Sequence, residues 1–171
     1  RMVGAWYWAQ DSKQRAGYAL DRELFREGVQ SQRIRWEDAK SAQALHLTQY
    51  LPRLKPGGRY LLTFWVRAEG IDACEGLTGY KTSHWGGHAN VSFGSAKQQN
   101  NNQFVPKGGF RGTFKWTKAG FRINAPKVFD PGARPYIRMS LNNAVGTIWF
   151  DDVRLREVDE DGRLAEDGAA K

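Results

Sequence analysis

Short segments of alternating apolar and polar residues recur along most of this chain, with turn signals between them. No amphipathic helix of convincing length interrupts the pattern, and residues 37–43 could form one helical turn. Strands of this length at this spacing are typical of antiparallel sandwiches and jelly rolls. The sequence therefore predicts an all-β fold, a single antiparallel β-sandwich of jelly-roll type. The expected strands are Ala5–Ala9, Gln32–Trp36, Ala44–Tyr50, Arg59–Ala68, Ala89–Gly94, Gly112–Trp116, Gly120–Ile123, Tyr136–Leu141 and Thr147–Leu155.

Glycine and proline clusters mark the expected turns, among them Pro56–Gly58 and Lys107–Gly109. The Asn- and Gln-rich stretch Gln98–Gln103 is interpreted as a solvated loop. We expect residues 1–157 to form one domain, and residues 158–171, which are charged and rich in Gly and Ala, to be a linker or tail. We also expect the chain to be part of a longer or processed protein.

The last expected strand contains two adjacent carboxylates, Asp151 and Asp152. Strand interiors disfavour Asp, so the pair needs a physical reason. A β-bulge, a bound cation or pairing with a cationic side chain would each supply one.

Alternation assigns side chains to the two faces of each strand. It places Trp65 and Arg67 outward on one strand, Asn90 on another, and Tyr136 and Arg138 on a third. Because a two-sheet sandwich has two outer faces, alternation alone does not place these side chains in one site.

Trp85 lies in a stretch of polar residues and glycines, together with His84 and His88. An aromatic ring there could stack on the C–H face of a sugar, while His84, His88 and Asn90 would satisfy hydroxyl groups. The alternative is that Trp85 folds back and plugs one end of the sandwich. Two His at spacing four could also suggest zinc, but no strong third ligand lies near them.

The charge of the chain is uneven. Residues 156–171 hold three basic and six acidic side chains, which leaves 23 basic and 12 acidic side chains, a net of +11, in residues 1–155 of a chain whose net charge is +8. A basic body favours a polyanionic partner. Arg67, Arg138 or Arg111 could hold a uronate or a sulfate group, although basic side chains can also simply solvate a surface.

Four stretches, taken in order, resemble a known protein group: Gly28–Ile34, Leu51–Arg67, Gly112–Thr117 leading to Phe121, and Gly146–Leu155. They are similar to carbohydrate-binding modules of the galactose-binding-domain-like β-sandwich group, of the type of families 4, 9 and 22. The resemblance covers roughly residues 5–157.

This resemblance implies a non-catalytic module that binds a polysaccharide or oligosaccharide and is tethered to a carbohydrate-active enzyme. It implies a bacterial protein that is secreted or exposed on the cell surface. It also implies a structural calcium ion at Asp151, with Asp152 beside it, although the acidic residue usual near the N-terminus of such modules is not obvious.

Two other function classes remain open. A jelly-roll polysaccharide lyase could use His84 or Tyr80 as base and Arg111 to neutralise a uronate, and a structural or protein-contact domain would need no site. The sequence contains no G-x-S-x-G, P-loop or H-E-x-x-H motif. It has no OB or RRM pattern either, so we expect no nucleic-acid partner. No apolar run of 18 residues occurs, and the single cysteine, Cys74, excludes an intrachain disulfide.

Overall fold

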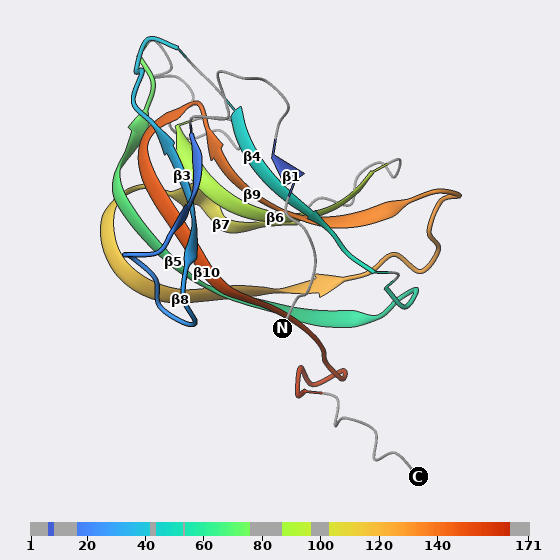
Figure 1. Cartoon of the computed structure of the whole chain (residues 1–171). Coiled ribbons are helices and arrows are strands. Elements are labelled where there is room, and N and C mark those ends of the chain that lie inside the picture. The colour runs from blue at the N-terminus through green and yellow to red at the C-terminus, as the bar shows by residue number, and fades with distance from the viewer. Residues whose placement is uncertain are drawn as a thin grey trace.

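Two five-stranded antiparallel sheets form the molecule (Figure 1). The computed structural model describes residues 7–8, 17–41, 44–52, 54–75, 87–96 and 103–164, and this part of the chain contains no helix. Sheet A has the strand order β1-β4-β9-β6-β7, and sheet B has the order β2-β3-β10-β5-β8. The strands are β1 (Tyr7–Trp8), β2 (Tyr18–Asp21), β3 (Ser31–Trp36), β4 (Ala44–Tyr50), β5 (Arg59–Ala73), β6 (His88–Ala96), β7 (Gln103–Phe110), β8 (Gly112–Asn124), β9 (Arg134–Asn142) and β10 (Ala144–Glu157). The predicted all-β sandwich is confirmed.

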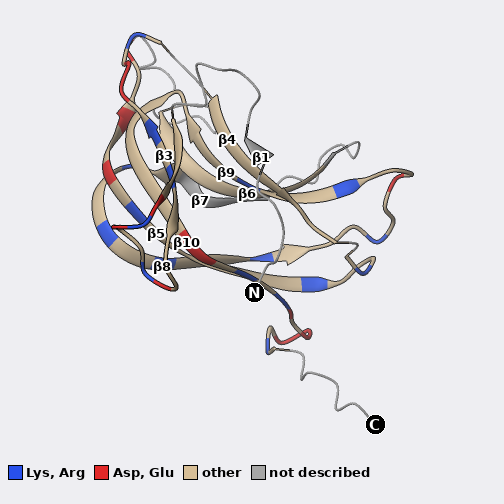
Figure 2. Cartoon of the chain, in the orientation of Figure 1, with Lys and Arg blue, Asp and Glu red and all other residues tan. Residues whose placement is uncertain are grey.

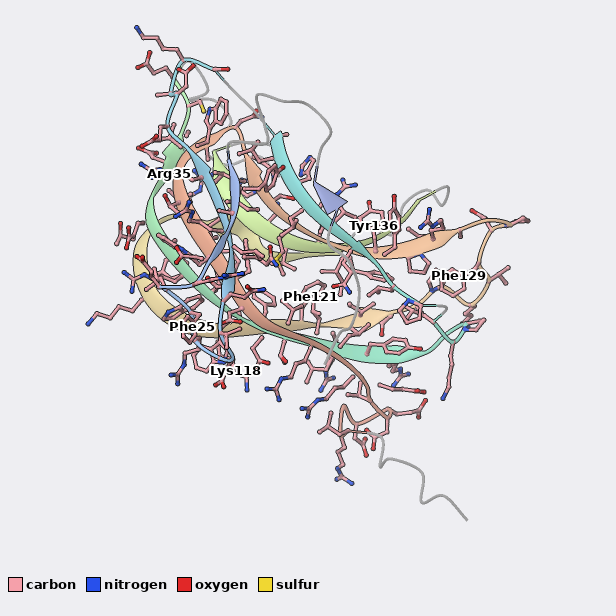
Figure 3. All side chains as sticks on the ribbon, viewed as in Figure 1. Phe25, Arg35, Lys118, Phe121, Phe129 and Tyr136 are labelled. Atoms are coloured by element: carbon pink, nitrogen blue, oxygen red, sulfur yellow. The ribbon has the colours of Figure 1, made fainter. Side chains whose placement is uncertain are left out.

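The core lies between the two sheets and follows the alternation of each strand. Leu62, Phe64 and Val66 of β5 face it from sheet B, and Ile137 and Met139 of β9 face it from sheet A, all at most 1% exposed. Figure 3 shows Phe121 of β8 between the sheets as well. Burial of these side chains fixes the register, since a slip of one residue would turn every apolar side chain outward.

Four details of the prediction were wrong. Strands β2 and β7 were not expected, and Lys107–Gly109 lies inside β7 instead of forming a turn. The segments 112–116 and 120–123 belong to one strand, β8, whose pairing with β5 shifts register at two places. Residues 39–41 form a turn and a bend, and the described part of 37–43 has no helical turn.

The strand β10 contains a bulge at the two carboxylates. Its pairing with β5 is in register from Thr147↔Glu69 to Asp151↔Trp65 and resumes at Arg154↔Thr63, and Asp152 has a φ of 46°. Asp tolerates this left-handed conformation better than most residues. The bulge lets Asp151 and Arg154 both remain on the outer face of sheet B.

Residues 158–164, assigned to the tail by their composition, form a bridged turn beside the sandwich. Val158 pairs with Leu164 and is 6% exposed, and its backbone N–H donates to the carbonyl of Arg59 at 2.9 Å. Ordered contacts with β5 therefore continue past residue 157.

Candidate functional site

The outer face of sheet A carries a continuous set of polar and aromatic side chains. Ser140 of β9 pairs with His46 of β4 and Asn90 of β6. Arg138 pairs in the same way with Thr48 and Ser92, and Tyr136 pairs with Tyr50. Paired residues of neighbouring strands point to the same side of a sheet, opposite to the apolar residues between them. We call this set the sheet A face; its members are His46, Thr48, Tyr50, His88, Asn90, Ser92, Arg134, Tyr136, Arg138, Ser140 and Asn142.

Hydrogen bonds link the polar members in pairs. His46 Nδ1 lies 3.0 Å from Ser140 Oγ, and Arg138 Nε donates to Thr48 Oγ1 at 3.2 Å. Asn90 Nδ2 lies 3.1 Å from His88 Nε2, so the ring nitrogen accepts from the amide when His88 is neutral. These bonds hold the side chains in fixed positions across β4, β9 and β6.

The small polar members are recessed. Thr48, His88, Asn90, Ser92 and Ser140 are between 2% and 9% exposed, whereas Tyr50, Tyr136 and Arg138 are half-buried. Buried polar atoms nearly always have hydrogen-bond partners. Asn90 Oδ1 is an exception in the part of the chain that the structure describes, because it is buried and accepts no hydrogen bond. A ligand hydroxyl or amide would supply the missing donor.

Two arginines stack on two tyrosines along one side of the sheet A face. The guanidinium carbon of Arg134 lies 4.0 Å from the centroid of the Tyr50 ring, and that of Arg138 lies 4.7 Å from the centroid of Tyr136. The two rings meet edge to face, with centroids 6.3 Å apart. The stacking keeps both guanidinium planes oriented, which favours bidentate bonds to a carboxylate or sulfate.

The sheet A face as defined contains no Asp or Glu, and sheet B differs in this respect. On sheet B, Arg33 pairs with Asp21, Arg67 with Glu69 and Arg154 with Asp152. Figure 2 shows acidic residues among the basic ones on β5 and β10, whereas the charged residues of β9 are all basic. The arginines of the sheet A face therefore have fewer neighbouring carboxylates than those of sheet B.

The structure separates Trp65 and Arg67 from His88, Asn90 and Arg138, the other predicted ligand-binding residues that it describes. Both lie on the outer face of sheet B, beside Asp151 and Trp149 of β10, whereas Arg138 lies on the outer face of sheet A. Figure 3 shows the same separation, with Tyr136 on sheet A and Lys118, the cross-strand partner of Trp65, beyond sheet B. A single site cannot include both groups.

Trp65 and Arg67 also have protein partners of their own. The Arg26 guanidinium carbon lies 4.7 Å from the centroid of the Trp65 ring. Arg67 donates to Glu69 at 2.7 Å and lies over Trp149. The half-buried Trp65 ring is thus covered on one side by a cation, which leaves less of it for a sugar.

Asp151 holds the loop between β2 and β3 in place. Its Oδ2 accepts the backbone N–H groups of Arg26 at 2.6 Å and Glu27 at 2.9 Å, and its Oδ1 accepts that of Asp152 at 2.7 Å. Asp152 Oδ1 in turn accepts from Arg154 Nε at 2.7 Å. The bulge is therefore capped by Asp151, and Asp152 has an arginine partner. These are the two explanations of the paired carboxylates that need no cation.

The calcium prediction requires oxygen ligands around Asp151. Hydrogen-bond donors surround that carboxylate instead, and the described residues contain no cluster of three or more His, Cys, Asp or Glu that could hold a metal ion. The described residues around Asp151 and Asp152 therefore do not fit a calcium ion.

Trp85 and His84, and Tyr80 of the lyase alternative, lie outside the described residues. His88 and Asn90, predicted together with them, begin β6 and lie on the sheet A face with Arg138. The ring of His88 packs on Gly109, whose φ of 77° suits glycine, and a Cβ at that position would come within 2.2 Å of the ring.

Sequence reasoning missed His46, Thr48 and Tyr50 as site residues. The signal was present, because Leu45 and Leu47 alternate with them in a segment that was correctly predicted as a strand. What was lacking was the pairing of β4 with β9, which places these side chains beside Arg138 and Tyr136.

His46 gives the sheet A face a dependence on pH. Burial, assisted by the nearby positive charge of Arg138, lowers the pKa of His46 from 6.5 to about 4. The unfolded chain then binds a proton at a higher pH than the folded chain does. The stability that the neutral ring confers is complete above pH 6.5 and is lost as the pH falls towards 4.

We expect the free energy of unfolding to fall by about 2 kcal/mol between pH 7 and pH 4 on account of His46, a value reduced for the partial exposure of the ring. Urea unfolding of the wild type and of His46→Asn at several pH values would isolate this contribution. If the free energy of unfolding changed with pH in the same way in both proteins, the contribution of His46 would be contradicted.

Comparisons with known proteins match this fold. No family model matches the sequence, and no curated protein matches it. Among solved structures, the chain is similar to a family 16 carbohydrate-binding module with 17% identity and a TM-score of 0.51, covering 81% of this chain and 84% of that chain. It is similar to a family 61 module in complex with β-1,4-galactotriose with 15% identity and a TM-score of 0.53, covering 89% and 88%.

Modules of families 4 and 22 are similar at 16% and 13% identity. A cyclase from Fischerella sp. TAU in complex with 4-(1H-indol-3-yl)butan-2-one is similar too, with 16% identity and a TM-score of 0.52, covering 92% of this chain and 76% of that chain. At these identities the likeness establishes the fold alone. The resemblance to carbohydrate-binding modules of the galactose-binding-like group is confirmed in that sense, and an enzyme can have the same fold.

Proposed function

We propose that this domain binds a polysaccharide or oligosaccharide on the sheet A face without chemical turnover. The observation that carries the proposal is the row of recessed polar side chains, with the buried and unpartnered Asn90 Oδ1, beside the stacked Tyr136 and Arg138. Hydroxyl groups of a glycan can donate to Asn90. The likeness to modules of families 16, 61, 4 and 22 supports a sugar as the ligand class.

We propose further that the glycan is acidic. Arg134 and Arg138 are oriented by their tyrosines, and the sheet A face contains no carboxylate to repel an anion or compete for the guanidinium groups. A uronate or sulfate ester suits such a pair. The net charge of +8 would assist the approach of an anionic polymer.

In this proposal the domain is an accessory module tethered to a carbohydrate-active enzyme and works outside the bacterial cell. It has no nucleic-acid partner. In the part of the chain that the structure describes, no helix is long and apolar enough to cross a bilayer.

A glycan array combined with assays for reducing sugar and for unsaturated product tests the function. We expect binding to uronate-containing or sulfated glycans, with no product released. Binding should weaken as salt is added, because the screening length falls to about 3 Å at 1 M. Turnover would favour the lyase alternative, and an absence of binding would favour the structural one. Binding to neutral β-glucan that ignores salt would contradict the acidic ligand.

A further inference from the structure

A second candidate site lies at an open edge of the sandwich, away from the sheet A face. A cavity of about 610 Å³ opens between β4, β10 and the loop that precedes β3. This volume is within the usual range of small-molecule pockets, about 300–1,000 Å³. Its uncharged lining includes Gln30, Gln32, Gln49, Phe150 and Val153, and its charged lining includes Glu27, Asp151, Asp152, Arg154 and Arg156.

Gln49 is the most informative of these residues. It pairs with the core residue Ile137, so its side chain points between the sheets, where apolar residues are expected. It is 3% exposed, and its Oε1 accepts no hydrogen bond from the described residues. Leaving a buried acceptor without a partner costs about 1–3 kcal/mol. A ligand donor in the cavity would remove that cost.

The other walls of the cavity specify the chemistry of such a ligand. Gln30 and Gln32 add two more amides, and each amide offers both donors and an acceptor. Phe150 and Val153 contribute apolar surface. A ring with hydroxyl groups on its edge and C–H groups on its faces matches this mixture of amides and apolar surface.

The charged groups of the cavity argue against an anionic ligand. The two carboxylates of the bulge line it, with Asp151 bonded to three backbone N–H groups and Asp152 bonded to Arg154. Glu27 lines it as well and adds a third negative charge. An anion would therefore meet more carboxylates than guanidinium groups, whereas a neutral ligand would leave the existing pairs intact.

We infer that this cavity is a second binding site, for one neutral monosaccharide unit, in which Gln49 accepts a hydrogen bond from a sugar hydroxyl. The site goes beyond the proposed function and does not depend on it, since the sheet A face and the cavity share no residue. The two sites also differ in ligand class, because the cavity would bind one neutral sugar unit and the sheet A face an acidic polymer.

The test uses methyl β-D-glucoside, methyl β-D-galactoside and methyl β-D-xyloside as probes, with binding followed by the amide side-chain signals of ¹⁵N-labelled protein. At least one glycoside should shift the Gln49 side-chain signals at millimolar concentration. In Gln49→Leu the dissociation constant should rise about tenfold or more, as expected when a hydrogen bond to a buried group is lost. The melting temperature of Gln49→Leu should stay level or rise, because the unpartnered acceptor is removed.

Controls separate the two sites. Arg138→Ala should bind the glycoside as the wild type does, and Gln49→Leu should bind an acidic polymer as the wild type does. If Gln49→Leu fails to fold, Gln30→Ala, at the half-buried rim, should weaken glycoside binding without loss of structure. The inference is overturned if none of the three glycosides shifts these signals, if both Gln variants bind with unchanged affinity, or if Gln49→Leu folds but melts lower with no change in binding.

Discussion

Replacing Asp151 by alanine should lower the free energy of unfolding by about 3 kcal/mol, which is the scale expected when a buried hydrogen-bond network loses its charged acceptor. Asp151 is 8% exposed, and its carboxylate accepts hydrogen bonds from the backbone N–H groups of Arg26, Glu27 and Asp152. Without it, these donors have no acceptor there, and the loop between β2 and β3 loses its attachment to β10. Denaturant unfolding measures the change.

The matched control is Asp130→Ala, an exposed carboxylate in the turn before β9, which should change stability by no more than about 0.5 kcal/mol. Asp151→Asn keeps one acceptor oxygen, so its loss of stability should lie between those of Asp151→Ala and Asp130→Ala. A chelator should leave the melting temperature of the wild type unchanged. A drop in melting temperature on chelation would contradict this role and favour a calcium ion. An Asp151→Ala protein as stable as the control would contradict a structural role for Asp151 of either kind.

Replacing Arg138 by alanine should weaken binding to an acidic glycan by roughly 10- to 100-fold, the effect of losing a charge-assisted hydrogen-bond pair of about 1.5–3 kcal/mol. Its guanidinium is held by Thr48 and by the Tyr136 ring, so it is oriented before the ligand arrives. Isothermal titration with the acidic glycan selected by the array measures the loss.

Arg67→Ala is the matched control, because Arg67 has the same charge but lies on sheet B and pairs with Glu69. It should bind the glycan as the wild type does. Equal losses in both variants would indicate attraction by net charge alone, and a loss in Arg67→Ala only would move the site to sheet B.

The sequence predicted the sandwich because its core strands alternate regularly, as β5 and β9 do. It missed β2, which has four residues, and β7, whose two glycines are typical of a turn. Such strands form because a neighbouring strand supplies their hydrogen bonds. The residues of the segment alone do not indicate which strand will lie beside it.

The candidate site was predicted less completely for the same reason. Alternation correctly placed Asn90 and Arg138 outward, but it could not decide which outer face each strand shares with the next. Pairing of β4 with β9 brings His46 and Thr48 to Arg138, and the position of β5 in the other sheet removes Trp65 and Arg67. The role of Asp151 depends on backbone N–H groups more than 120 residues away in the chain, which no local pattern encodes.

Mapping of the bound glycan by ¹H–¹⁵N spectra of the labelled domain tests the central proposal most directly. The acidic glycan selected by the array should shift signals of the sheet A face, above all the side-chain amide of Asn90 and the backbone amides of Arg138 and Ser140. Signals of the outer face of sheet B, such as Arg67 and the indole of Trp65, should stay in place. Shifts confined to sheet B would contradict the proposal that the sheet A face is the glycan-binding site.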